Sequence, residues 1–280
     1  MNRRIGLFTF IVWSVALVAN AGASEPTEYV LAATGSIEIG PDGSVNDYTV
    51  DNDLAAPIAS AIDRHVRSWR FQPVRIDGRP VIAKSRMHLS LRAVPAGDNL
   101  ELRVDEVSFG GAGEPSEATK REHPLRYPRR AREERLGARV LLAVRTDASG
   151  KVIEVHPYQT SLSQRMGEGA ARRWRGVFER AVMDIVAQWT FDPGEVIDGT
   201  PMAGRFLMPV EFTIGTQRPH PDAWRTYVPG PVDPAPWFDI EPEQSARIAA
   251  LGDGDTLSLE SRFVRLDDAT PAAAPRTPDT

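Results

Sequence analysis

The order of apolar and polar positions predicts a β-hairpin and then a helix in the first half of the chain. Residues 36–39 alternate polar and apolar side chains, residues 41–44 read Pro-Asp-Gly-Ser, and residues 45–50 resume an extended pattern, which is typical of two strands joined by a turn. After Pro57, apolar side chains recur at spacings of four, four and three, at Ile58, Ile62, Val66 and Trp69. This spacing places them on one face of a helix.

The second half of the chain repeats this order. Val140, Leu142 and Val144 fall at alternate positions, residues 147–150 form a turn sequence, and residues 152–155 continue as a strand that Pro157 ends. The apolar face of a second helix is formed by Val177, Phe178, Ala181, Val182, Ile185, Val186 and Trp189. Residues 163–176 stand between the hairpin and this helix without a counterpart in the first half, so we interpret them as an insertion.

A last strand of the second half is predicted over residues 205–214, with Phe206, Met208, Val210 and Phe212 on one side. Pro209 lies inside this strand and has no N–H to donate to a β-ladder. We therefore expect one side of the strand to be an unpaired edge or a bulge.

A longer motif recurs within this pattern. Trp69-Arg70-Phe71-Gln72-Pro73 with Asp77-Gly78-Arg79-Pro80 is matched by Trp189-Thr190-Phe191-Asp192-Pro193 with Asp198-Gly199-Thr200-Pro201, at offsets of 120 and 121. A repeat of this length predicts that one structural unit occurs twice. The structural residues that we expect to hold each helix end against its sheet are Trp69, Phe71, Pro73, Trp189, Phe191 and Pro193.

These elements predict an α+β fold of two tandem β-β-α-β units, each a small antiparallel sheet with one helix packed on it. We expect the first unit over residues 30–110, a linker over 111–126, the second unit over 127–215 and a Pro-rich C-terminal tail over 216–280. The aromatic residues of the tail favour a segment that lies over the folded units. Its last residues, 267–280, are expected to be disordered.

The N-terminus predicts export. Arg3 and Arg4 precede an apolar run over residues 5–19, and small residues follow, which is typical of a cleaved signal peptide over residues 1–23. An uncleaved inner-membrane anchor, with the protein facing the periplasm, is the alternative. The chain has no cysteine, so disulfides and Cys-based metal sites or nucleophiles are excluded. Its net charge of −5 argues against nucleic acid as the main partner.

The second unit resembles the C-terminal domain of TonB-type energy transducers. The resemblance is carried by Tyr127-Pro128 and the arginines after it, Gly137-Ala138-Arg139-Val140, Ser149-Gly150-Lys151-Val152, Gln188-Trp189-Thr190-Phe191-Asp192-Pro193, Pro201, and Pro209-Val210-Glu211-Phe212. The first unit is similar to a degenerate copy that lacks the Tyr-Pro lead-in.

The resemblance implies a periplasmic module of Gram-negative bacteria whose last strand pairs with a short peptide from an outer-membrane or other envelope protein. On this sequence, the partner-binding residues would be Arg205, Phe206, Leu207, Met208, Val210, Glu211 and Phe212. The family's retained membrane anchor and long Pro-rich spacer are not matched, so protein binding carries over while a link to TonB-type transport stays open. The other possibility is that the edge of this strand is covered by the other unit or by the tail.

Neither catalytic residues nor a cofactor or metal site are predicted. The five histidines show no zinc-site spacing, and no nucleophile elbow, phosphate-binding loop or dinucleotide motif occurs. Residues 120–139 hold eight Lys or Arg against three Glu. This basic stretch is either a solvated linker helix or a contact with anionic envelope polymers or lipid headgroups. A structural envelope protein that binds cell-wall polymer or a membrane surface is therefore the alternative to a protein-binding module.

Overall fold

The fold is taken from a computed structural model, which describes residues 29–96, 99–115, 117–214, 226–237, 240, 244–258 and 260–266. The expected signal peptide and the expected disordered end of the tail lie outside the described residues. Among the described helices, none is long and apolar enough to cross a membrane.

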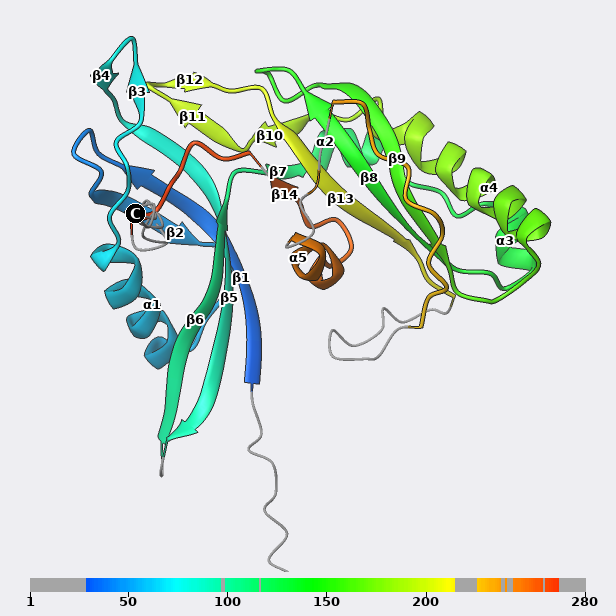
Figure 1. Cartoon of the computed structure of the whole chain (residues 1–280), viewed down its shortest axis with the longest axis horizontal. Helices are drawn as coiled ribbons and strands as arrows, with labels where there is room; N and C mark the ends of the chain where they lie inside the picture. Colours follow the sequence, from blue (N-terminus) through cyan, green and yellow to red (C-terminus); the bar gives the residue numbers. More distant parts are fainter. Residues whose placement is uncertain are drawn as a thin grey trace, which may run out of the picture.

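The first half of the chain builds an antiparallel sheet with a helix on one face (Figure 1). Its elements are β1 (Tyr29–Ile39), β2 (Val45–Val50), α1 (Ala56–Ser68), the short hairpin of β3 (Arg75–Ile76) and β4 (Arg79–Pro80), β5 (Ala83–Ala96) and β6 (Asn99–Phe109). β1 pairs with β2 on one side and with β5 on the other. α1 buries Ile62 and Val66, as the apolar spacing predicts, and Pro57 stands in its first turn, where the missing N–H costs no hydrogen bond.

The second half has the same strand order in its own sheet. β8 (Ala138–Thr146) pairs with β9 (Val152–Leu162) on one side and with β13 (Arg205–Phe212) on the other, and α4 (Glu168–Val186) packs on one face. The remaining helices are α2 (Glu117–Glu122), α3 (Arg129–Glu133) and α5 (Ser245–Ala250). The mixed α+β class with mostly antiparallel sheets is thus confirmed.

Strands from the second half extend the first sheet. β11 (Glu195–Ile197) pairs with β5 and also with β12 (Thr200–Pro201). Next to it, β7 (Ala112–Pro115) pairs with β10 (Phe191–Pro193). The expected linker over residues 111–126 is therefore wrong in its first part, because residues 112–115 are hydrogen-bonded to the second half and α2 follows them.

The expected insertion before the second helix is part of that helix. α4 begins at Glu168, so most of residues 163–176 are helical. The reason is that Ala171, Trp174 and Phe178 continue the spacing of three and four that buries the later turns. The added turns therefore have their own contact with the sheet.

The two Trp-x-Phe segments have matching local geometry. Phe71 N donates to Gly43 O and Phe191 N donates to Gly150 O, both at 2.9 Å. The side chains of each pair make edge contacts, with ring centroids 6.4 Å apart for Trp69 and Phe71 and 5.9 Å apart for Trp189 and Phe191. All four rings are buried. Pro73 and Pro193, the last members of the two motifs, are both half-buried.

The described part of the tail lies across both halves. Ala235, Trp237, Ile240, Ile248 and Leu251 pack on the face of the second sheet that α4 leaves uncovered, against Leu141, Ala143 and Leu207. Farther along, Phe263 enters the aromatic core of the first half, 5.9 Å from the Phe71 ring and 5.8 Å from the Phe109 ring. The tail therefore completes one core and covers the other sheet.

Candidate functional site

β13 carries all seven residues that the resemblance assigns to partner binding. Phe206, Met208, Val210 and Phe212 are buried in the core beneath α4, and Leu207 is buried under the tail on the opposite face. The Arg205 side chain is exposed and pairs with Glu260 at 2.8 Å. Glu211 keeps only 5% of its side chain exposed, with Oε1 3.6 Å from Arg139 Nε. Most of these side chains thus serve the core.

The outer edge of β13 is occupied by the tail, so the expected open edge is wrong and the alternative, an edge covered by the tail, is what the structure has. β14 (Leu257–Ser258) pairs with Phe206 and Leu207. Beyond it, Gly254 N donates to Pro209 O at 2.9 Å and Glu211 N donates to Asp253 Oδ1 at 2.8 Å. Pro209 lies at a position where no N–H is needed for the ladder with β8, because its backbone faces the tail. The proline marks the correct edge, but the chain itself fills that edge.

The outer edge of β9 is also filled by the tail. Val228 and Leu162 exchange backbone hydrogen bonds of 2.7 and 3.1 Å, and Asp233 N donates to Tyr158 O at 2.8 Å. An isolated bridge between Gln159 and Val232 lies between these contacts. A proline-flanked extended segment therefore adds to this sheet as a strand would.

β2 occupies the position in the first sheet that β9 occupies in the second, and its outer edge is open. Successive residues of a strand direct their N–H and C=O groups to alternate sides. Because Asp51 N donates to Thr34 O at 2.8 Å, the backbone of Thr49 faces β1 and the backbones of Tyr48 and Val50 face outward. Within the described residues, no backbone group pairs with this outward side between Val45 and Val50.

The open edge of β2 has one apolar and one acidic side. Tyr48 and Val50 lie on the side of α1, with Leu54 and Ile58 partly buried beside them. Tyr48 Oη donates to Asp63 Oδ1 at 2.8 Å. Burial of the phenol, and then this hydrogen bond, raise the pKa of Tyr48 to about 12. This pair fixes the edge strand to the helix.

The other side of β2 is polar. Asp47 and Thr49 are exposed there. Asp47 lies directly opposite Glu38 in the β1–β2 ladder, which places two acids side by side. The Asp47 carboxylate also accepts a hydrogen bond from Tyr48 N at 2.9 Å, so of the two outward N–H groups of Tyr48 and Val50 only that of Val50 has no partner among the described residues.

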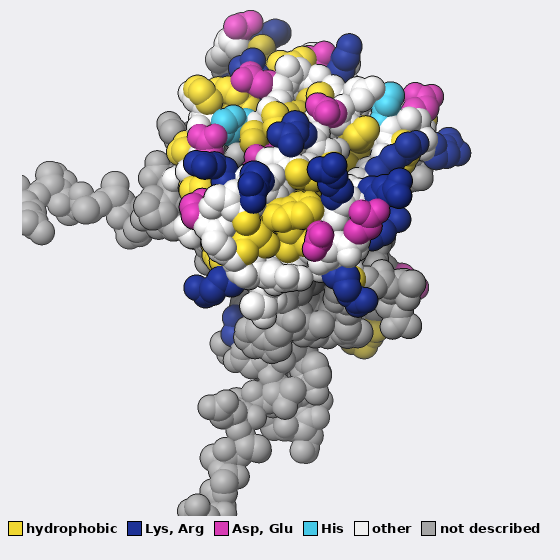
Figure 2. All heavy atoms as spheres, turned by 90° about the vertical axis from the view of Figure 1, so that its right-hand side faces the viewer, with side chains coloured by type: hydrophobic (Ala, Val, Ile, Leu, Met, Phe, Trp, Pro, Cys, Tyr) yellow, Lys and Arg dark blue, Asp and Glu magenta, His cyan; other side chains and the backbone are white. Residues whose placement is uncertain are grey.

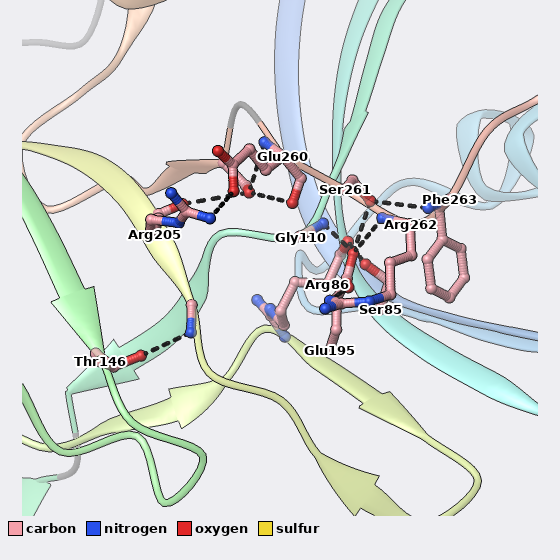
Figure 3. Close-up of polar contacts among 12 residues, drawn as sticks. Ser85, Arg86, Gly110, Thr146, Glu195, Arg205, Glu260, Ser261, Arg262 and Phe263 are labelled. Atoms are coloured by element: carbon pink, nitrogen blue, oxygen red, sulfur yellow. Dashed lines mark hydrogen bonds and ion pairs between the residues drawn. The ribbon is translucent and has the colours of Figure 1, made fainter. Parts of the chain in front are cut away.

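A cleft of about 760 Å³ lies where the two halves and the tail meet (Figure 3). Each arginine in its wall pairs with a glutamate: Arg145 with Glu154, Arg205 with Glu260 and Arg262 with Glu195, at 2.8, 2.8 and 2.9 Å. Glu195 is 6% exposed, and its Oε1 also accepts hydrogen bonds from Ser261 Oγ and Arg262 N. Because these charges are paired within the chain, we interpret the cleft as a contact that holds the tail against the two halves.

The basic stretch over residues 120–139 is spread over several elements. It runs from the end of α2 through α3 into β8. Lys120 pairs with Glu114 at 2.6 Å, and Arg139 donates to the carbonyls of Ile248 and Leu251. The exposed cations of this stretch are therefore Arg121 in α2 and the arginines of α3 and its flanks. Over the described ranges, no group of three or more His, Asp or Glu side chains is arranged to hold a metal ion.

Sequence reasoning missed β2 as the candidate site. The hairpin itself was predictable, but which edge stays open depends on where the tail pairs, and that contact joins residues far apart in the chain. The one local signal was the pair of opposed acids, Glu38 and Asp47. Comparisons with family models, with curated proteins and with solved structures gave no match for this chain.

Proposed function

We propose that this protein is a non-enzymatic, TonB-like binding module of the periplasm that takes an extended peptide from an envelope protein by strand addition at β2. The observation that carries the proposal is the contrast between the three comparable edges. The edges of β9 and β13 each hold an extended segment of the tail, whereas the edge of β2 holds none among the described residues. The same sheet architecture thus accepts added strands at β9 and β13, and none is added at β2 within the described residues.

The proposal includes two tandem β-β-α-β units. The matching strand orders β5-β1-β2 and β13-β8-β9 support this interpretation, as do the matching bonds of Phe71 to Gly43 and of Phe191 to Gly150. The second unit is closed by the tail, so partner binding falls to the first unit. If the partner is an outer-membrane protein, we also propose a link to TonB-type transport.

The two sides of β2 define the peptide. A guest strand would place alternate side chains over Tyr48 and Val50, which favours apolar residues at those positions. The intervening side chains would lie beside Asp47, whose charge favours a Lys or Arg at that position, as Lys84 stands beside Glu38 on the other side of β1. We therefore expect an extended peptide with alternating apolar and basic residues.

The test is recovery of partners from envelope extract with the purified protein as bait. Val50→Pro removes the outward N–H, and Val50→Thr is the matched control because it keeps that N–H and the β-branched shape. We expect Val50→Pro to lose the partner and Val50→Thr to retain it, with both variants folded by thermal unfolding. Equal recovery with Val50→Pro and wild type would show that β2 is not the binding edge.

A further inference from the structure

An arginine-rich face lies at the end of the molecule farthest from β2, where α3 adjoins the start of α4 (Figure 1). Residues 129–135 and 164–175 together hold eight Arg and three Glu, a net charge of +5 in a chain of net charge −5. Gln164 Nε2 donates to Arg135 O at 3.0 Å, so the two segments are neighbours. Just outside them, the rings of Tyr127 and Phe178 are 6.2 Å apart. Figure 2 shows many Lys and Arg side chains on this side of the molecule, with apolar and some acidic side chains between them.

Most of these arginines are not neutralised. The exposed side chains of Arg130, Arg132, Arg135, Arg165, Arg172 and Arg173, hereafter the arginine face, form no ion pair with any described residue. Arg129 forms an ion pair with Glu133, and Arg175 forms one with Glu168. Glu134 is then the one acid of the two segments without an ion pair among the described residues. The six cations therefore have no acidic partner among the described residues, although the Arg132 guanidinium lies over the Tyr127 ring, 5.5 Å from its centroid.

Arg135 adds an independent observation. Its backbone has a φ of +52°, in the left-handed region that favours glycine, and it closes the end of α3. Glycine would be favoured in this conformation, so replacing Arg135 by glycine removes one charge of the arginine face without straining the backbone.

The shape of the arginine face favours a flat partner over a linear one. The cleft between the halves and the smaller pocket beside α5 both lie elsewhere, so neither described cavity would hold a polymer chain here. Met166 and Trp174 are only partly buried within the same segments, and a tryptophan among arginines suits the boundary between lipid headgroups and acyl chains. Arginine also binds phosphate through two parallel hydrogen bonds.

We propose that the arginine face binds the surface of a bilayer that contains anionic phospholipids. Binding there leaves β2 at the opposite end of the molecule accessible to a peptide. This inference is independent of strand addition, because it uses none of the residues of β2.

The test is co-sedimentation of the exported protein with vesicles of phosphatidylcholine alone and of phosphatidylcholine mixed with an equal amount of phosphatidylglycerol. We expect binding to the mixed vesicles only, and release by high salt. The double charge reversal Arg172→Glu/Arg173→Glu should weaken binding at least about tenfold. The matched control Arg64→Glu/Arg79→Glu makes the same charge change on exposed, unpaired arginines of the first half and should bind like wild type.

A second variant separates binding from folding. Arg135→Gly relieves the left-handed backbone, so its unfolding temperature should equal or exceed that of wild type while vesicle binding falls. Equal binding to neutral vesicles, or equal loss in both charge-reversal variants, would overturn the proposal. Binding to soluble polyphosphate as tight as binding to vesicles would also overturn it, because the surface would then be a site for polyanions in solution.

Discussion

Glu38 and Asp47 lie directly opposite each other in the ladder that joins β1 to β2. Like charges in this position destabilise a sheet, by about 0.5 kcal/mol for an exposed pair. Glu38 has Lys84 on its other side, in the ladder between β1 and β5, whereas Asp47 stands on the outer strand β2. A basic side chain from outside would therefore be stabilised beside Asp47.

Replacing one of these acids should separate stability from binding. Asp47→Asn removes the repulsion and keeps an oxygen for the Tyr48 amide, so the free energy of unfolding should rise by about 0.5 kcal/mol. Recovery of the partner should fall, because the attraction for a basic guest residue is lost. Asp53→Asn, an exposed acid in the loop after β2, is the control and should change neither quantity. A destabilised Asp47→Asn protein would contradict this account.

The Tyr48–Asp63 pair predicts a loss of stability at alkaline pH. Burial and then the hydrogen bond to Asp63 raise the pKa of Tyr48 from 10.0 to about 12. Because the folded pKa is above the unfolded value, the contribution of this group is complete below pH 10.0 and is lost as the pH rises towards 12. Tyr48→Phe should show a smaller fall in unfolding temperature over this window.

Ultraviolet titration of Tyr48 tests the two causes separately. Asp63→Asn should lower the pKa of Tyr48 but leave it above 10.0, since burial is the larger cause. A Tyr48 pKa that returns to 10.0 in this variant would show that the charge of Asp63 is the dominant cause instead. Subtracting the absorbance titration of Tyr48→Phe from that of wild type removes the signal of the other tyrosines.

Two glycines in matching turns should be irreplaceable. Gly43 and Gly150 both have positive φ, and a Cβ at either position would lie 2.0 or 1.8 Å from the carbonyl oxygen of Phe71 or Phe191. Gly43→Ala and Gly150→Ala should each lower the free energy of unfolding by more than about 3 kcal/mol, because the backbone bond to the phenylalanine must break.

The controls for this prediction are Gly78→Ala and Gly199→Ala. Both glycines have positive φ, but nothing lies within 4 Å of an added Cβ. These variants should lower the free energy of unfolding only by the backbone strain of an alanine at positive φ, about 1 kcal/mol. Equal losses at all four positions, measured by chemical denaturation, would show that close approach is unimportant.

Phe263 should contribute strongly to stability although it belongs to the tail. Its ring is 5% exposed and contacts Phe71 and Phe109. Phe263→Ala should cost about 3–5 kcal/mol through lost burial and an unfilled cavity. Val264→Ala, at a neighbouring side chain that is 48% exposed, should change stability by less than about 0.5 kcal/mol. A small effect of Phe263→Ala would mean that the tail is not part of the core.

Local features of the fold were predictable from the sequence because their causes are local. The spacing of Ile58, Ile62 and Val66 fixes the buried face of α1, and the Asp-Gly turns at Asp77 and Asp198 have the left-handed backbone that such pairs favour. The burial of the repeated Trp and Phe residues also follows from the pattern, since each ends an apolar stripe.

The candidate site was not predictable in the same way. Pro209 correctly marks the side of β13 that lacks a ladder donor, but no local pattern shows that residues 253–258 fill that side. The pairing of β11 with β5 is likewise a contact between the two halves of the chain. Such contacts depend on the assembled shape, so an edge that is open in one unit can be closed in the other.

Amide hydrogen exchange of the free protein tests the central claim most directly. The Val50 amide should exchange at nearly the rate of an unprotected amide, while its neighbour Thr49, which faces β1, should be protected. The Leu162 amide, which donates to Val228, should be protected in the same experiment. Addition of the recovered partner should then protect Val50. Protection of Val50 equal to that of Thr49 in the free protein would show that the edge of β2 is already filled, and strand addition there would be excluded.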